Sequence, residues 1–152
     1  MADVKEGAKA PDFELESAEG PIRLGDFAGK TLVLYFYPKD DTTGCTMEAQ
    51  AFTELAGDFA KAGATVVGVS KDSVKSHEKF AGKYGLAVRL GSDTSGVIER
   101  YESWVQKKLY GREYMGIDRS TFLIKDGTIR RIWRKVKVPG HAQAVLDAVK
   151  SA

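Results

Sequence analysis

The sequence predicts a layered α/β domain with a central mixed β-sheet. Apolar runs of strand length alternate along the chain with amphipathic segments of helical length, as expected when helices pack on a sheet. The dipeptide Asp126-Gly127 between two apolar runs adds an antiparallel hairpin. The 152 residues suit one hydrophobic core, and no linker or repeat divides them. We therefore expect a single domain over residues 1–152.

The N-terminal half is predicted to contain a short hairpin, two buried strands and one long helix. Residues 13–15 and 22–24 alternate apolar and polar side chains on either side of a turn, which predicts the hairpin. Residues 31–37 and 64–70 are almost continuously apolar, as in strands that are buried on both faces. Between them, apolar residues recur at helical spacing from residue 43 to residue 62.

The C-terminal half is predicted to continue the alternation and to end on a helix. The expected elements are a helix over 73–84 that Ser73 caps, a strand over 88–90, a short helix over 93–101, strands over 121–125 and 128–133, and a helix over 141–151. Residues 102–118 are predicted to form a long loop rich in Tyr, Trp and Gly. Trp104, Tyr110 and Tyr114 either line the mouth of a pocket near Cys45 or fill a core inside that loop.

The composition excludes several classes of protein. Hydrophobic residues make up 43% and charged residues 29% of the chain, and the net charge is +2, so charge offers no argument for binding nucleic acid or an anionic membrane. No apolar run approaches the roughly 18 residues of a membrane span, and the N-terminus lacks an apolar signal core. His77 and His141 stand far apart without cysteine neighbours, so we expect no metal and no other cofactor.

A basic run over residues 130–137 has two interpretations. Arg and Lys interleaved with Trp133 can bind single-stranded nucleic acid. Alternation of these charges with apolar residues is better explained by an edge strand that cations protect from pairing. We therefore expect no nucleic-acid partner.

Cys45 is the only cysteine, and it follows a buried strand at the head of an amphipathic helix. With Thr42 as the N-cap, Cys45 becomes the third helical residue, where free backbone N–H groups and the helix dipole favour an anion. Those surroundings favour the reactive thiolate. A lone cysteine also occurs as a small buried hydrophobe. One cysteine excludes an intramolecular disulfide, and a reducing cytoplasm is the expected location.

The motif Pro38-x-x-x-Thr42-x-x-Cys45 resembles the active site of the peroxiredoxins. Further segments are similar to the bacterioferritin comigratory protein (Bcp) or PrxQ subfamily: residues 10–13, 35–40, 44–46, 68–70, 116–117, 119–124 and 136–141. The resemblance implies a thioredoxin-like fold with an N-terminal β-hairpin. It also implies an antioxidant thiol peroxidase that reduces hydrogen peroxide and organic hydroperoxides.

The resemblance assigns a role to five residues. Cys45 matches the peroxidatic nucleophile, Thr42 the residue that orients the sulfur and the peroxide, and Pro38 the residue that shields the pocket. Arg119 matches the arginine that stabilises the thiolate, and Glu48 matches an acidic residue that holds this arginine. Without the resemblance, Arg119 reads as a solvated charge and Glu48 as compensation of the helix dipole.

The chemistry requires more than a thiolate, because lowering the pKa of a thiol also lowers its nucleophilicity. Donors must hold the peroxide and stabilise negative charge on the oxygen that departs. Thr42, Arg119 and the backbone amides near Gly44 and Cys45 are the candidates. The expected product is a sulfenic acid at Cys45.

The sequence departs from the subfamily pattern at three positions. Thr43 replaces the usual proline of the first helical turn. Gln50 and Ala81 stand where relatives carry a resolving cysteine, so the chain resembles a one-cysteine member. We expect an external thiol (thioredoxin, glutaredoxin or a low-molecular-weight thiol) to recycle the sulfenic acid, and we expect a monomer.

Two other functions compete with this interpretation. A buried strand that leads into Asp40-Asp41-Thr42 suggests a phosphotransferase with an acidic loop, although adjacent aspartates point apart and no phosphate-binding glycine loop is present. A binding protein of the same fold, with Cys45 inert, is the second alternative.

Overall fold

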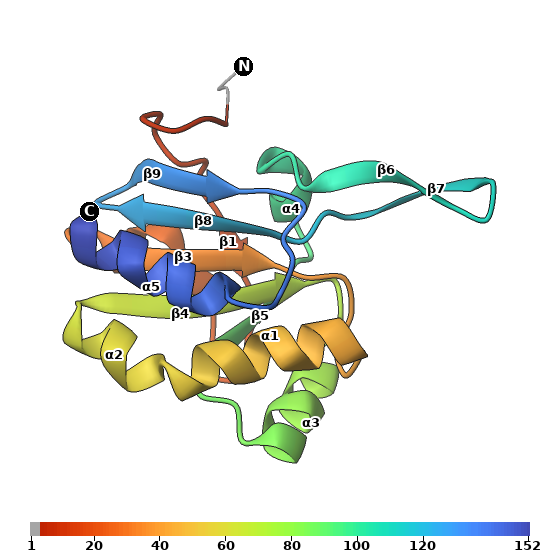
Figure 1. The fold of residues 1–152 in the computed structure, drawn as a ribbon, viewed down its shortest axis with the longest axis horizontal. Helices are drawn as coiled ribbons and strands as arrows, with labels where there is room; N and C mark the ends of the chain where they lie inside the picture. Colours follow the sequence, from red (N-terminus) through yellow and green to blue (C-terminus); the bar gives the residue numbers. More distant parts are fainter. Residues whose placement is uncertain (1–3) are drawn as a thin grey trace.

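The computed structural model describes residues 4–152, and a five-stranded mixed sheet lies at its centre (Figure 1). The strand order is β5-β4-β3-β8-β9. The bounds are β3 Thr31–Phe36, β4 Ala64–Ser70, β5 Arg89–Ser92, β8 Ser120–Lys125 and β9 Thr128–Trp133. β3, β4 and β5 run parallel, whereas β8 pairs antiparallel with both β3 and β9. The predicted mixed sheet is confirmed.

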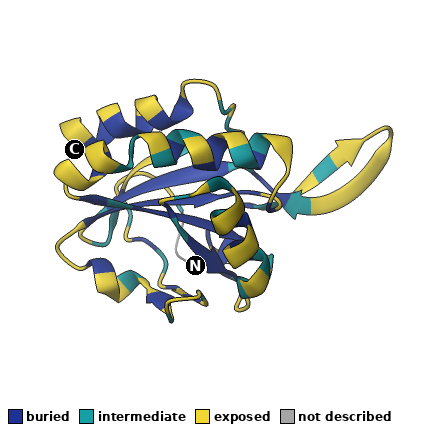
Figure 2. Cartoon of the chain, turned by 90° about the horizontal axis from the view of Figure 1, so that it is seen from below, coloured by how far each residue is buried: buried dark blue, intermediate teal, exposed yellow. Residues whose placement is uncertain are grey.

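Helices and the N-terminal hairpin cover the two faces of this sheet (Figure 2). The α-helices are α1 Thr43–Glu54, α2 Ala56–Lys61, α3 Val74–Tyr84, α4 Val97–Arg100 and α5 His141–Ser151. Phe52 of α1, Phe59 of α2, Phe80 of α3 and Val145 of α5 share one core on one face. The opposite face packs against α4, the 3-10 helix Leu24–Phe27 and the hairpin. The hairpin itself is β1 Glu14–Leu15 and β2 Ile22–Arg23, as predicted.

The predicted helix over 43–62 is wrong in one respect, because it breaks at Leu55. There the backbone takes φ −97° and ψ 5°, which ends α1 and begins α2. Phe52 and Phe59, on either side of the break, pack in the same core with ring centroids 5.8 Å apart. Helical periodicity alone does not show such a bend, because apolar residues recur at helical spacing on both sides of it.

The predicted loop over 102–118 is wrong, because these residues form a second hairpin that projects from the body (Figure 1). Strands β6 Trp104–Leu109 and β7 Arg112–Ile117 pair antiparallel around Tyr110 and Gly111, whose φ values are 50° and 77°. Neither face of this hairpin packs on the core along most of its length, so the sequence lacks the alternation that marks a half-buried strand.

Neither expected role of the three aromatic residues holds for all of them. Tyr110 is 97% exposed at the tip of the hairpin and Tyr114 is 47% exposed, so neither fills a core. Trp104 is half-buried against the core that α4 covers, and the Lys71 ammonium lies 4.7 Å from its ring centroid. Arg130 and Arg131 of the basic run are exposed on edge strand β9, as expected, whereas residues 134–137 lie beyond the end of this strand. Within residues 4–152, no helix has the length and hydropathy that crossing a membrane requires.

Candidate active site

Cys45 lies where strand β3 leads into helix α1. Tyr37 to Thr42 form the connection, and α1 begins at Thr43 with Thr42 in the N-cap position. Cys45 is therefore the third helical residue, as expected, and its sulfur is free and only 1% exposed. Residues of the first helical turn have no partner within the helix for their N–H groups. This position surrounds the sulfur with dipoles that favour an anion.

Arg119 reaches this helix from the turn between β7 and β8. Its Nη2 donates to Cys45 Sγ at 3.3 Å, and its Nη1 donates to Glu48 Oε1 at 2.7 Å. Glu48 lies one turn beyond Cys45 on α1, with its side chain 1% exposed. One guanidinium thus bridges the sulfur and a buried carboxylate. The geometry brings together three of the residues that the sequence singled out.

Burial and charge act in opposite directions on this pair. Burial raises the pKa of Glu48 to about 7, although the Arg119 charge and hydrogen bond lower it. Burial lowers the pKa of Arg119, but attraction to Glu48 and Cys45 outweighs it and leaves that pKa raised. Glu48 Oε2 and Tyr35 Oη are buried without a hydrogen-bond partner among the described residues. Burial and the Glu48 charge also raise the pKa of Tyr35.

Gly44 has a steric role that the sequence analysis missed. A Cβ atom at this position would lie 3.1 Å from Arg119 Nη2, which is closer than most Cβ contacts. Glycine therefore leaves room for the guanidinium beside the first turn of α1. The signal in the sequence is the glycine directly before Cys45, whose expected contribution was a backbone amide alone.

Thr42 and Pro38 lie on the exposed side of the connection. The Thr42 hydroxyl donates to the carbonyl of Lys39 at 2.8 Å and makes no side-chain cap of α1. Its single hydrogen is therefore directed at Lys39 and not at Cys45 in this structure. Pro38 is exposed at a bend just beyond β3, and its shielding of the pocket stays a prediction. Gln50 is exposed on α1, and Ala81 is half-buried on α3.

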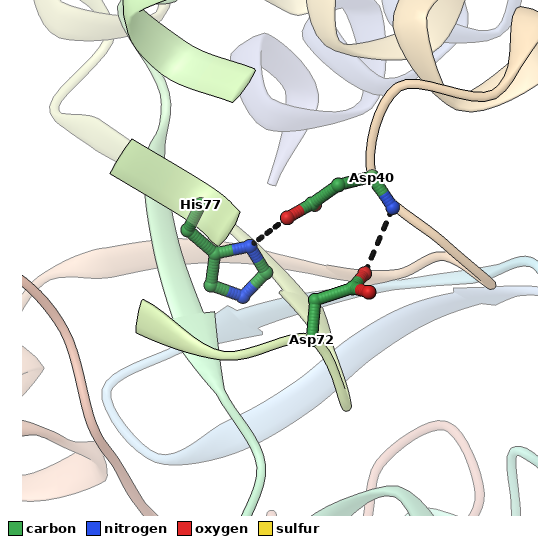
Figure 3. Close-up of side chains that lie close together, drawn as sticks. All are labelled: Asp40, Asp72 and His77. Atoms are coloured by element: carbon green, nitrogen blue, oxygen red, sulfur yellow. Dashed lines mark hydrogen bonds and ion pairs between the residues drawn. The ribbon is translucent and has the colours of Figure 1, made fainter. Parts of the chain in front are cut away.

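A buried polar network beside the connection was not predicted (Figure 3). His77 Nδ1 lies 2.7 Å from Asp40 Oδ2, and Asp72 Oδ2 accepts from the Asp40 backbone N–H at 2.8 Å. The spacing of these residues along the chain contains no signal for the contact. In the described part of the chain, these three residues form the one His, Cys, Asp and Glu group whose ligand atoms lie within 4.8 Å of one another. Their contacts are hydrogen bonds between the residues themselves.

His141 lies near the site and is neutral. Its Nε2 lies 2.7 Å from the hydroxyl of Thr121 on β8. Burial, and then the Arg119 charge, lower the pKa of His141 to about 4. An uncharged imidazole here leaves Arg119 as the positive charge that contacts the sulfur.

Comparisons with known proteins show which family the chain belongs to. Residues 7–132 match the model of the AhpC/TSA family. A peroxiredoxin Bcp of Bacillus subtilis is 47% identical over 147 residues, covering 95% of this chain and 94% of the relative. A putative peroxiredoxin Bcp of Coxiella burnetii is 47% identical, covering 94% and 97%. A solved structure of Xanthomonas campestris peroxiredoxin Q has a TM-score of 0.88 and 45% identity, covering 99% and 97%.

The thioredoxin-like fold and a cysteine held by an arginine at a helix N-terminus define a peroxiredoxin, a thiol-dependent peroxidase. The chain belongs to the AhpC/TSA family, and its relatives place it with the Bcp/PrxQ peroxiredoxins. Its one cysteine is Cys45.

Proposed function

We propose that Cys45 is the nucleophile with which this thiol peroxidase reduces hydrogen peroxide and organic hydroperoxides. The contact from Arg119 Nη2 to Cys45 Sγ at 3.3 Å is the observation on which the proposal rests. A cation at hydrogen-bond distance stabilises the thiolate. The same group stands beside the oxygen that develops negative charge during attack.

The reaction proceeds by attack of the Cys45 thiolate on one oxygen of the peroxide, in line with the O–O bond. The S–O bond forms as the O–O bond breaks, and the departing oxygen takes a proton to become water or an alcohol. Cys45 is oxidised by two electrons to a sulfenic acid. Arg119 and the backbone amides of the first turn of α1, near Gly44, are the proposed donors to the peroxide. Thr42 can join them once its hydroxyl rotates away from Lys39.

An external thiol completes the cycle, because no second cysteine exists in the chain. A thiol condenses with the sulfenic acid and releases water, which leaves a mixed disulfide at Cys45. A second thiol then reduces the mixed disulfide and restores the Cys45 thiol. Thioredoxin, glutaredoxin or a low-molecular-weight thiol fits this role, and we propose a reducing cytoplasm as the location.

A related structure supports the substrate class. A neighbour with a TM-score of 0.88 and 44% identity was solved to study alkyl peroxide reduction by the bacterioferritin comigratory protein of Xanthomonas campestris. The test is peroxide consumption with dithiothreitol present, comparing the parent with Cys45→Ser for hydrogen peroxide and for cumene hydroperoxide. We expect the variant to be inactive toward both. A rate that survives the substitution would assign the activity to another group.

We also propose that the protein is a monomer. Arg130 and Arg131 are exposed on edge strand β9, where their charges oppose pairing with a second sheet. Sedimentation velocity at micromolar concentration is the test, and a stable dimer would contradict the proposal.

A further inference from the structure

Side chains of helix α3 contact two consecutive aspartates in the connection between β3 and α1. The first is Asp40, which is 8% exposed. Asp40 Oδ2 accepts from His77 Nδ1 at 2.7 Å and from the Ser76 hydroxyl at 2.8 Å. Asp40 Oδ1 accepts from the hydroxyl of Tyr37, and Asp72 holds the Asp40 backbone N–H (Figure 3). Both the side chain and the backbone of Asp40 are therefore fixed.

His77 is bound on both sides of its ring. Its Nε2 lies 3.2 Å from the carbonyl oxygen of Gly91 on β5, while its Nδ1 faces Asp40. Both ring nitrogens thus lie within hydrogen-bond distance of oxygen atoms, which fixes the orientation of the imidazole ring. Hydrogen bonds from His77 and Tyr37 lower the pKa of Asp40 although its burial raises it. The connection is therefore joined to α3 through a buried contact between Asp40 and His77, whose side chains are each 4% exposed.

The second aspartate is Asp41, whose backbone is left-handed with φ 59°. Such a conformation is unfavourable for most residues other than glycine and persists when its surroundings hold it. Lys83 Nζ donates to Asp41 Oδ2 at 2.8 Å, and the Tyr84 hydroxyl donates to Asp41 Oδ1. Both residues belong to the last turn of α3. Together with Ser76 and His77, they form a set of four α3 donors that we call the α3 brace.

We propose that the α3 brace positions the first turn of α1 for peroxide attack, with Asp40 and His77 as positioning residues. Thr42 and the N-terminus of α1 follow directly after Asp40 and Asp41 in the chain. Arg119, in contrast, approaches Cys45 from the connection between β7 and β8. The sulfur and the guanidinium therefore belong to separate segments, and their alignment depends on how firmly the connection is held. Small misplacements of reacting groups cost large factors in rate.

Ala81 lies on α3 between the two donor pairs of the brace, with Ser76 and His77 before it and Lys83 and Tyr84 after it. Because position 81 is alanine, α3 supplies no thiol that could form an internal disulfide with Cys45. This inference rests on the proposed role of Cys45. The inference predicts an effect on the oxidation of Cys45 by peroxide alone, because no residue of the brace supplies the thiol that reduces the sulfenic acid.

The experiment measures two steps separately in His77→Leu. Stopped-flow kinetics give the second-order rate of Cys45 oxidation by hydrogen peroxide, and a second mixing step gives the rate at which dithiothreitol reduces the sulfenic acid. We expect oxidation to slow by about tenfold or more and reduction to change by less than about twofold. His77→Asn keeps one N–H donor near the position of Nδ1 and should recover most of the oxidation rate. Lys79 is exposed on the same helix, and Lys79→Met should have the parent's rates in both steps.

Three outcomes would overturn the brace. They are an unchanged oxidation rate in His77→Leu, equal losses in both steps, or equal rates for His77→Asn and His77→Leu. If His77→Leu does not fold, the double variant Lys83→Met, Tyr84→Phe is the deciding test, because it removes only the exposed donors to Asp41. A parent-like oxidation rate in this double variant would refute the proposal. Activity in Cys45→Ser would instead refute the proposed function.

Discussion

Replacing Arg119 with Met tests the electrostatics of the site most directly. The change removes a charge that contacts Cys45 Sγ at 3.3 Å and Glu48 Oε1 at 2.7 Å, and it keeps much of the aliphatic stem. The substitution should lower the rate of peroxide reduction through its effect on the sulfur, and it should lower the free energy of unfolding through its effect on the buried carboxylate. These two effects can be measured separately. The dependence of each on pH distinguishes them.

The stability cost depends on whether Glu48 is charged. With a pKa of about 7, Glu48 is mostly ionised at pH 8.5 and mostly neutral at pH 5.5 in the parent. Without Arg119 the buried carboxyl must stay protonated, and holding a proton 1.5 pH units above a pKa of 7 costs about 2 kcal/mol. We expect Arg119→Met to lose about 1 kcal/mol at pH 5.5, as for one hydrogen bond, and about 3 kcal/mol at pH 8.5. Urea unfolding at the two pH values measures this difference.

The activity cost should persist at both pH values. Removing one preorganised donor to a developing oxyanion costs about 10²–10³ in rate, and we expect that loss in peroxide reduction. Adding Glu48→Gln removes the buried charge, so the double variant should show no extra loss of stability at pH 8.5. Its rate should stay low. Arg130→Met, an exposed change on β9, is the matched control and should match the parent.

Either of two results would refute this reasoning. Equal destabilisation at pH 5.5 and pH 8.5 would mean that Glu48 does not change its charge between them. Recovery of peroxide reduction in the double variant would mean that Arg119 acts only by neutralising Glu48.

The remaining predictions concern packing, a second titration and recycling. Gly68→Ala places a Cβ 2.6 Å from Tyr35 Cζ, so thermal unfolding should show a loss of about 1–3 kcal/mol; Gly57→Ala, with open space around it, should be neutral or stabilising, and equal effects would contradict the packing. His141, with its pKa lowered to about 4, is neutral in the folded state and takes up a proton on unfolding, so stability should rise with pH between about 4 and 6.5. His141→Gln should flatten that rise, and an unchanged slope would argue against a buried neutral imidazole. In the parent, one equivalent of peroxide should add one oxygen in non-reducing mass spectrometry. Ala81→Cys should instead lose two hydrogens through an internal disulfide, and the same oxygen adduct in both would contradict that expectation.

The sequence correctly predicted the helices and strands that are specified by residues within or next to them. Residues 31–37 and 64–70 are almost continuously apolar because the strands they form are buried on both faces. Ser73 accepts from the Ser76 backbone N–H at the start of α3, and Gly85 ends that helix with φ 60°, so both ends follow from nearby residues. The hairpin β6–β7 was missed because most of its side chains face solvent and no burial pattern constrains them.

The fold class and the place of Cys45 in the first turn of a helix can be predicted without a structure, because periodicity and the residues beside the cysteine indicate both. The family resemblance added Arg119, which lies 74 residues away along the chain. Three features are visible only in the folded chain: one guanidinium bridges Cys45 and Glu48, Gly44 makes room for it, and His77 lies within hydrogen-bond distance of Asp40. These contacts join segments that are distant in sequence. Side-chain spacing along one element cannot specify them, because the packing of the sheet and helices brings them together.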